Sequence, residues 1–213
     1  MNGNLIEQVI RYYSVNGFVI LQAMGRQTLM AFDGVVLAVM VGIPLGIVGQ
    51  RFRRIGQVIV TVTNLLQIMP GLALMSLLMV IFGLGSQTVV MTVFLYSLLP
   101  IIGNTLTGLL SVPSALQDVG KGLGMTRWQV LMRINLPIAL PAIMTGVRNA
   151  LIVSISIATL GAFIGGGGLG DIIIRGLNAS DGGVIIIAGV IPTIVLAMVG
   201  DSLIQWLTRY LRS

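Results

Sequence analysis

The chain has 213 residues, of which 56% are hydrophobic and only 8% are charged, and its formal net charge is +6. Soluble domains carry charge at about a quarter of their positions, so this composition excludes a soluble protein and identifies an all-α integral membrane protein. The absence of Cys and His excludes disulfides, thiol catalysis and imidazole metal ligands, and the basic residues are expected in orienting loops rather than against nucleic acid.

The first 27 residues are less apolar than the rest of the chain. Ile6, Val9, Ile10 and Tyr13 recur at helical spacing among polar residues. The pattern predicts an amphipathic segment, residues 1–27, lying on the outer membrane surface ahead of a membrane domain at 28–213.

Five later segments are long and apolar enough to cross a bilayer, which takes about 20 residues. They are predicted at residues 28–50, 57–82, 88–111, 141–164 and 184–207. Within the second, Pro70 removes a backbone donor beside Gly71, so we expect a kink there.

The loops between these spans differ in charge. One side collects basic residues against a single acid, Asp118, and the other holds a balanced set. The basic side has Arg51, Arg53, Arg54, Lys121, Arg127, Arg133, Arg209 and Arg212; the balanced side has Arg11, Arg26, Arg175, Glu7, Asp171 and Asp181. The positive-inside rule therefore predicts five spans with the N-terminus outside and the C-terminus in the cytoplasm.

Three ionisable residues fall within or near spans: Asp33, Arg148 and Asp201. Arg148 and Asp201 lie at similar depths from the cytoplasmic side, and an unpaired charge at that depth is unfavourable, so we predict that they form a buried ion pair. The alternative is a proton or ion relay, which would make the protein a secondary transporter. Asp33 is expected to reach interfacial water.

A polar loop, residues 112–140, separates the third and fourth spans. "SALQ" at residues 114–117 and "TRWQ" at 126–129 each fit the capping box and predict two short helices with Gly124 between them. Trp128 and Leu131 fall on one face of the second helix, which either folds back onto the spans or docks into a partner. Pro137 and Pro141 are expected to set a turn back into the membrane.

This loop resembles the EAA motif of permeases of ATP-binding-cassette (ABC) importers, written E-A-A, three residues, G, nine residues, I-x-L-P. The G and I-x-L-P elements match in register, whereas Asp-Val-Gly replaces E-A-A and keeps only the acid. The resemblance implies a coupling helix that contacts an ATPase subunit. The candidate coupling residues are Asp118, Val119, Gly120, Gly124, Trp128, Leu131, Ile134, Leu136 and Pro137.

Other stretches, including "LLQIMPGLAL", "YSLLPIIGNTLTGL" and "ATLGAFIGGGGLGDIIIRGLN", are similar to permeases of osmoprotectant importers for glycine betaine, carnitine or choline. The resemblance implies the type I ABC importer fold of the methionine importers. It also implies two ATPases carrying ATP and Mg, a second permease chain (identical or a paralogue) and an extracytoplasmic substrate-binding protein.

Two glycine motifs do not predict a nucleotide site in this chain. "GGGGLG" at residues 165–170 follows an apolar span rather than a strand, and Lys121 lacks the remainder of a phosphate loop. We therefore expect no cofactor here. The glycines predict either a non-helical outer segment beside the pathway or a plain flexible loop.

Polar residues inside the spans are candidates for lining a translocation pathway, with hydrogen bonding between helices as the alternative for each. They are Asn64, Gln67, Asn104, Ser154, Ser156 and Thr159, and the kink residue Pro70 is a further pathway candidate.

The function predicted from these features is the non-catalytic permease subunit of an ATP-driven osmoprotectant importer in the bacterial cell membrane. The alternatives are an importer of methionine or ergothioneine and, ranked lower, an ion-coupled secondary transporter. A membrane enzyme ranks last, because no cluster of nucleophile, base or metal ligands is present.

Overall fold

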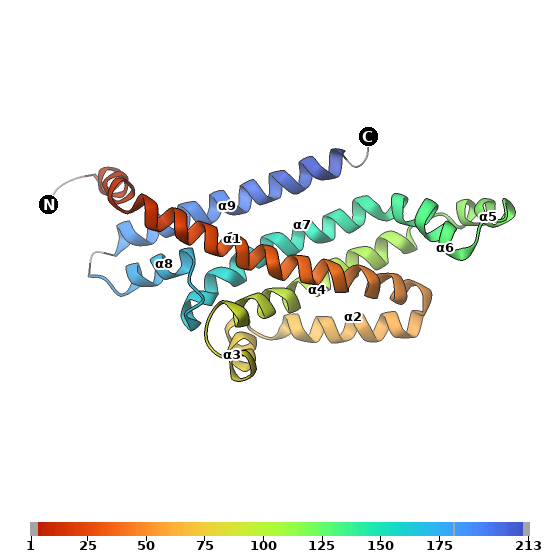
Figure 1. Ribbon diagram of the computed structural model, residues 1–213, viewed down its shortest axis with the longest axis horizontal. Coiled ribbons are helices and arrows are strands. Elements are labelled where there is room, and N and C mark those ends of the chain that lie inside the picture. Colours follow the sequence, from red (N-terminus) through yellow and green to blue (C-terminus); the bar gives the residue numbers. More distant parts are fainter. Residues whose placement is uncertain (1–3, 181, 211–213) are drawn as a thin grey trace.

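The computed structural model describes residues 4–180 and 182–210, and every regular element in those ranges is a helix. Asp181 and Arg212, used in the charge count, lie outside the described residues. Four helical segments are long and apolar enough to span a membrane, and a bent helix pair that passes the same test together makes five if it is one span. In Figure 1, the first helix begins at one end of the long axis, and the last helix runs from that end toward the other, as an odd number of crossings requires.

The first helix, α1 (Leu5–Arg51), is continuous for 47 residues. At a rise of 1.5 Å per residue its path length is about 70 Å, more than one crossing of the hydrocarbon layer needs. No helix end falls at residue 27, but the first turns of α1 are seen nearly end-on in Figure 1 and so run at an angle to the rest of the helix; the surface position of this segment stays a prediction. Its described residues stay helical because Ile20 and its neighbours pack on Ile172 and Leu169, and Tyr13 donates to the carbonyl of Ala188.

The second crossing is broken. Helices α2 (Arg53–Ile68) and α3 (Gly71–Phe82) meet at 101°, so the expected kink at Pro70 is close to a right angle. Two side-chain bonds hold the corner: the Tyr96 hydroxyl donates to the Met69 carbonyl, and Gln67 Nε2 donates to the Tyr96 carbonyl at 2.9 Å. The first of them satisfies a carbonyl that the break leaves without a helical partner.

The centre of the bundle is α4 (Ser86–Leu110), which packs along both α1 and α7 (Leu136–Leu160). Val93 and Ile101 of α4 are fully buried. On the facing side of α1 stand Gly34 and Gly42, where an added Cβ would lie 2.4 Å and 2.9 Å from those two side chains. Small residues thus let the helix backbones approach closely, as is typical of membrane bundles.

At one end of the bundle, two short helices project beyond the spans: α5 (Ser114–Gly122) and α6 (Arg127–Val130). From α6 the chain runs without a turn through a π-helical stretch (Leu131–Asn135) into α7, and the prediction that Pro137 and Pro141 set a turn is wrong. Pro137 directly follows the π-helical stretch and Pro141 lies inside α7, so both prolines are taken into this continuous helical run.

At the opposite end, a 3-10 turn (Gly161–Ile164) leads through four glycines into the short helix α8 (Leu169–Leu177), and α9 (Gly183–Tyr210) then returns along the bundle. Gly165, Gly167 and Gly168 have φ of 72°, 83° and 88°, which favours glycine. Gly166 donates to Gly161 and is buried, so residues 165–168 form a packed turn. The non-helical segment is confirmed there, but Leu169 and Gly170 already belong to α8.

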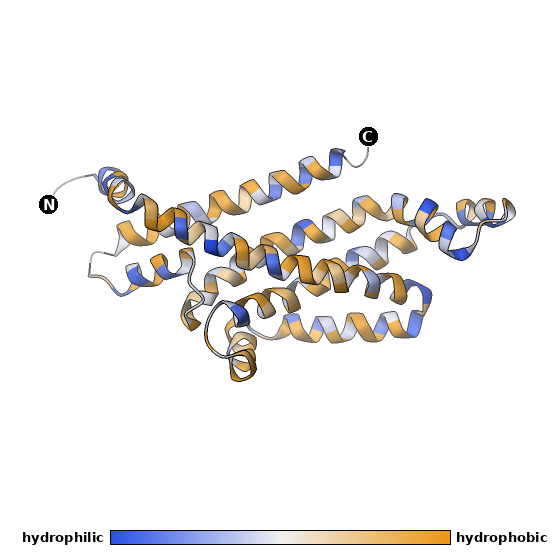
Figure 2. Ribbon diagram, in the orientation of Figure 1, coloured by the Kyte–Doolittle hydropathy of each residue, from blue (hydrophilic) through white to orange (hydrophobic). Residues whose placement is uncertain are grey.

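Hydrophobic residues cover the long helices, and hydrophilic residues gather at the α1–α2 turn and around α5 and α6 (Figure 2). This end carries Arg51, Arg53, Arg54, Lys121 and Arg127, so it is the cytoplasmic end under the positive-inside rule.

Candidate functional site

The projecting helix α5 presents an apolar face to water. Leu116 and Val119 on α5 and Leu123 at its C-cap follow one another at helical spacing and are 44%, 61% and 73% exposed. Contiguous exposed apolar side chains on a cytoplasmic helix mark an interaction surface. We call these three residues the coupling face. Leu116 and Leu123 were missed in the sequence, although their i, i+3, i+7 spacing with Val119 could have identified them.

Helix α5 is fixed to the bundle through Gly120. Gly120 is buried, and a Cβ there would lie 2.7 Å from Ile134 Cδ1, so a larger side chain at the third position of the motif would displace the end of the Ile134 side chain. The chain then reverses at Gly124, which has φ +76° and donates to the Lys121 carbonyl at 2.9 Å. Gly120 and Gly124 therefore set the angle at which α5 projects.

The two predicted capping boxes have different outcomes. At Thr126 the box is confirmed: Gln129 N donates to Thr126 Oγ1 at 3.3 Å, and Thr126 N donates to Gln129 Oε1 at 2.8 Å. At Ser114 it is wrong, because Pro113 occupies the N-cap and Ser114 is already helical. Gln117 there donates back to the Val112 carbonyl instead.

Of the remaining candidate residues in the loop, some are exposed on the surface and others pack against the spans. Asp118 forms an exposed ion pair with Lys121 at 2.8 Å, and Trp128 is 64% exposed. Leu131 and Leu136 pack against the Leu109 cluster, so they hold the loop to the spans. Pro137 is exposed at the start of α7.

The seven pathway candidates do not converge on one space within the single chain. Asn104 donates to Pro100, Ser154 to Leu151 and Thr159 to Ile155, all backbone carbonyls. Gln67 and Pro70 form the α2–α3 corner, and Asn64 and Ser156 are exposed. A role in lining a pathway stays a prediction for all seven.

Gln27 is a polar residue that the sequence did not single out. It is fully buried in α1, and its Nε2 donates to Thr159 Oγ1 at 2.8 Å and to the Ile155 carbonyl at 3.3 Å. Its Oε1 accepts from the N–H of Leu169 at 2.9 Å. Gln27 thus joins α1, α7 and the start of α8 at the outer end.

Arg148 of α7 and Asp201 of α9 are joined by two bonds, Nε to Oδ1 and Nη2 to Oδ2, the second at 2.9 Å. Gln205 adds a 2.8 Å bond to Oδ2. The predicted pairing is present, but the side chains are 40% and 23% exposed in the single chain, so the predicted burial is not reached. The bidentate geometry clamps α7 to α9.

No group of three or more His, Cys, Asp or Glu side chains that could hold a metal ion occurs in the part of the chain that the structure describes.

Comparison with known proteins gives one family match, to the binding-protein-dependent transport system inner membrane component, over residues 38–213. The choline transport system permease protein OpuBD of Bacillus subtilis is 48% identical over 208 residues, which cover 98% of this chain and 92% of that protein. The glycine betaine/carnitine/choline transport system permease protein OpuCD of the same organism is 49% identical, covering 97% of this chain and 90% of that protein.

Among solved structures, the inward-facing MetNI methionine ABC transporter aligns with a TM-score of 0.77 at 18% identity, covering 91% of this chain and 96% of that one. At this identity the likeness establishes the fold alone. The predicted type I importer fold is confirmed.

Proposed function

The chain belongs to the family of binding-protein-dependent transport system inner membrane components, multi-pass proteins of the cytoplasmic membrane, and we propose that it is the permease of an ATP-driven importer of quaternary-amine osmoprotectants. Its solutes are glycine betaine, carnitine, choline or a close analogue. The names of its relatives support this solute class, and methionine or ergothioneine import is the alternative.

The observation that carries the proposal is the coupling face. Three large apolar side chains stand in water on a helix that is anchored by a buried glycine, at the cytoplasmic end of a membrane bundle. Covering them with a partner removes apolar surface from water, which stabilises association by about 1.5–3 kcal/mol for each fully buried side chain. An ATPase subunit that binds ATP and Mg is the partner that fits a permease of this family.

The proposed assembly contains two permease chains, two ATPases and an external binding protein. This chain contributes the rigid link: α5 rests on Ile134, and the chain continues from there into α7 without a turn. A displacement of α5 by the ATPases is thereby passed to the span that Gln27 and Arg148 join to α1, α8 and α9. No chemical step is assigned to this chain.

The test is ATP hydrolysis by the chain reconstituted with its ATPase and binding protein. We expect stimulation by glycine betaine, carnitine or choline. Leu123→Glu, which places a charge on the coupling face, should reduce ATPase association by roughly tenfold or more. The matched control is Leu5→Glu, at an exposed position at the other end of the bundle.

The outcomes separate the alternatives. If only methionine or ergothioneine stimulates ATP hydrolysis, the proposed solute class is wrong and that compound is the solute. Uptake that persists without ATP and collapses with an uncoupler would replace the proposal with secondary transport. Equal ATPase binding by Leu123→Glu and wild type would remove the coupling face from the mechanism.

A further inference from the structure

A groove of about 1140 Å³ opens at the cytoplasmic end, between the last turn of α1 and the α5–α6 segment. Its walls come from three parts of the chain: Ile47 and Arg51 on α1, Lys121 on α5, and Arg127 and Leu131 after the loop. We call it the basic groove. Because α1 ends at Arg51 and α7 begins at Leu136, the groove lies at the level where the spans leave the membrane.

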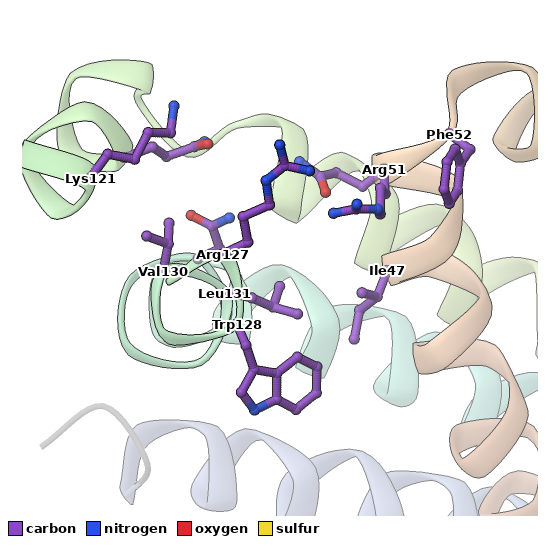
Figure 3. A pocket seen from close by; sticks show the side chains of 11 residues that line it. Ile47, Arg51, Phe52, Lys121, Arg127, Trp128, Val130 and Leu131 are labelled. Carbon is purple, nitrogen blue, oxygen red and sulfur yellow. The ribbon is translucent and has the colours of Figure 1, made fainter. Parts of the chain in front are cut away.

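The charges in the basic groove are not balanced. No acidic side chain is among the described residues that line it, and Lys121 has a carboxylate partner, Asp118, outside the groove. In the described part of the chain no ion pair joins Arg51 or Arg127 to an acid. Figure 3 shows the Arg51 and Arg127 side chains in the same part of the groove. Two guanidinium groups so placed favour an anion, and guanidinium forks match phosphate oxygens.

The other half of the groove is apolar. Ile47 and Leu131 face one another below the arginines, and Trp128 projects from the same wall (Figure 3). A free inorganic anion would make no favourable contact with this apolar half. A molecule with an anionic head and a hydrocarbon tail matches both halves, and basic pockets at the cytoplasmic interface are typical sites for such lipids.

From these observations we propose that the basic groove binds an anionic phospholipid of the inner leaflet, with its phosphate on Arg51 and Arg127. The lipid would lie between the α1–α2 turn and the coupling helices. This inference goes beyond the proposed function, since it requires only this chain and a bilayer.

The test counts phospholipids bound to the full chain by native mass spectrometry after equilibration with equal phosphatidylglycerol and phosphatidylethanolamine. We expect a preference for phosphatidylglycerol. Each basic residue near a membrane surface contributes about a fivefold preference, so Arg51→Gln or Arg127→Gln should reduce it about fivefold and the double variant about thirtyfold. Arg209→Gln, at the same end on α9 but outside the lining of the groove, is the matched control and should lose less of the preference than either groove variant.

Equal binding of the two lipids by wild type, or an unchanged preference in both single variants, would overturn the proposal. Competition by millimolar glycerol 3-phosphate as effective as that by the lipid would overturn the lipid assignment, because the apolar half of the groove would then contribute nothing. The single variants keep the test decisive if the double variant does not fold. Because no ATPase is present, failure here leaves the importer assignment intact.

Discussion

The side-chain amide of Gln27 donates a 2.8 Å hydrogen bond to the hydroxyl of Thr159, which lies 132 residues further along the chain. The same side chain accepts from the N–H of Leu169, so one buried residue joins three helices around the glycine turn. Its polar atoms are satisfied in a place where water cannot replace their partners. Gln27 therefore holds the outer end of the bundle together.

Replacing Gln27 by Leu keeps the side-chain size and removes these bonds. The Leu169 N–H is then left unpaired in the protein interior, and we expect a loss of about 1–3 kcal/mol in the free energy of unfolding. Thermal unfolding of the detergent-solubilised chain measures this. Gln22→Leu is the control, since Gln22 is exposed on the same helix. Similar unfolding temperatures for the two variants would contradict the role of Gln27.

Tyr96→Phe tests the corner between α2 and α3. The variant keeps the ring and removes the hydroxyl that donates to the Met69 carbonyl at the break. We expect about 1–2 kcal/mol of destabilisation and faster proteolysis near Pro70, because the corner loses one of its two side-chain bonds. Tyr12→Phe, on α1 and away from the corner, is the control. Equal proteolysis of both variants would show that the corner holds without the hydroxyl.

Features that depend on a few neighbouring residues could be read from the sequence. Runs of apolar residues located the spans, and Thr126 with Gln129 identified a helix start. The capping box at Ser114 failed because Pro113 shifted the helix start by one residue. Pro70 indicated a break, but the 101° angle depends on Tyr96, which belongs to another helix.

Features that depend on distant contacts could not be read from the sequence. Gln27 has partners more than 120 residues away, and nothing around it in the sequence indicates them. The polar residues before residue 27 predict a surface segment, and nothing around them indicates that α8 and α9 supply apolar contacts to the same helix. The Arg148–Asp201 pair was predictable because two rare charges at equal depth leave few other arrangements.

Removing one member of the Arg148–Asp201 pair should lower the folded fraction of the chain more than removing both. Arg148→Gln leaves the Asp201 carboxylate with only Gln205 as a partner among the described residues, whereas Arg148→Gln with Asp201→Asn leaves two neutral amides that can bond to each other. The measurement is the folded fraction of each variant by gel filtration in detergent. Arg175→Gln, exposed at the outer end, is the control. If the folded fraction of the double variant is no higher than that of the single variant, the pair does not clamp α7 to α9.

The coupling loop offers a pair of glycines that differ in one respect only. A Cβ added at Gly122 or at Gly124 would meet nothing within 4 Å, but Gly124 has φ +76° and Gly122 is helical. Gly122→Ala should be neutral or slightly stabilising, because alanine favours the helix. Gly124→Ala must accept the left-handed conformation, at about 1–2 kcal/mol, or open the turn that positions α5. We therefore expect Gly124→Ala, and not Gly122→Ala, to weaken ATPase binding and solute-stimulated hydrolysis while both chains remain in the membrane. If the solute stimulates ATP hydrolysis equally in assemblies that contain either variant, the loop does not need a fixed turn at Gly124. The coupling face would then act through a flexible contact with the ATPase rather than as part of a rigid link.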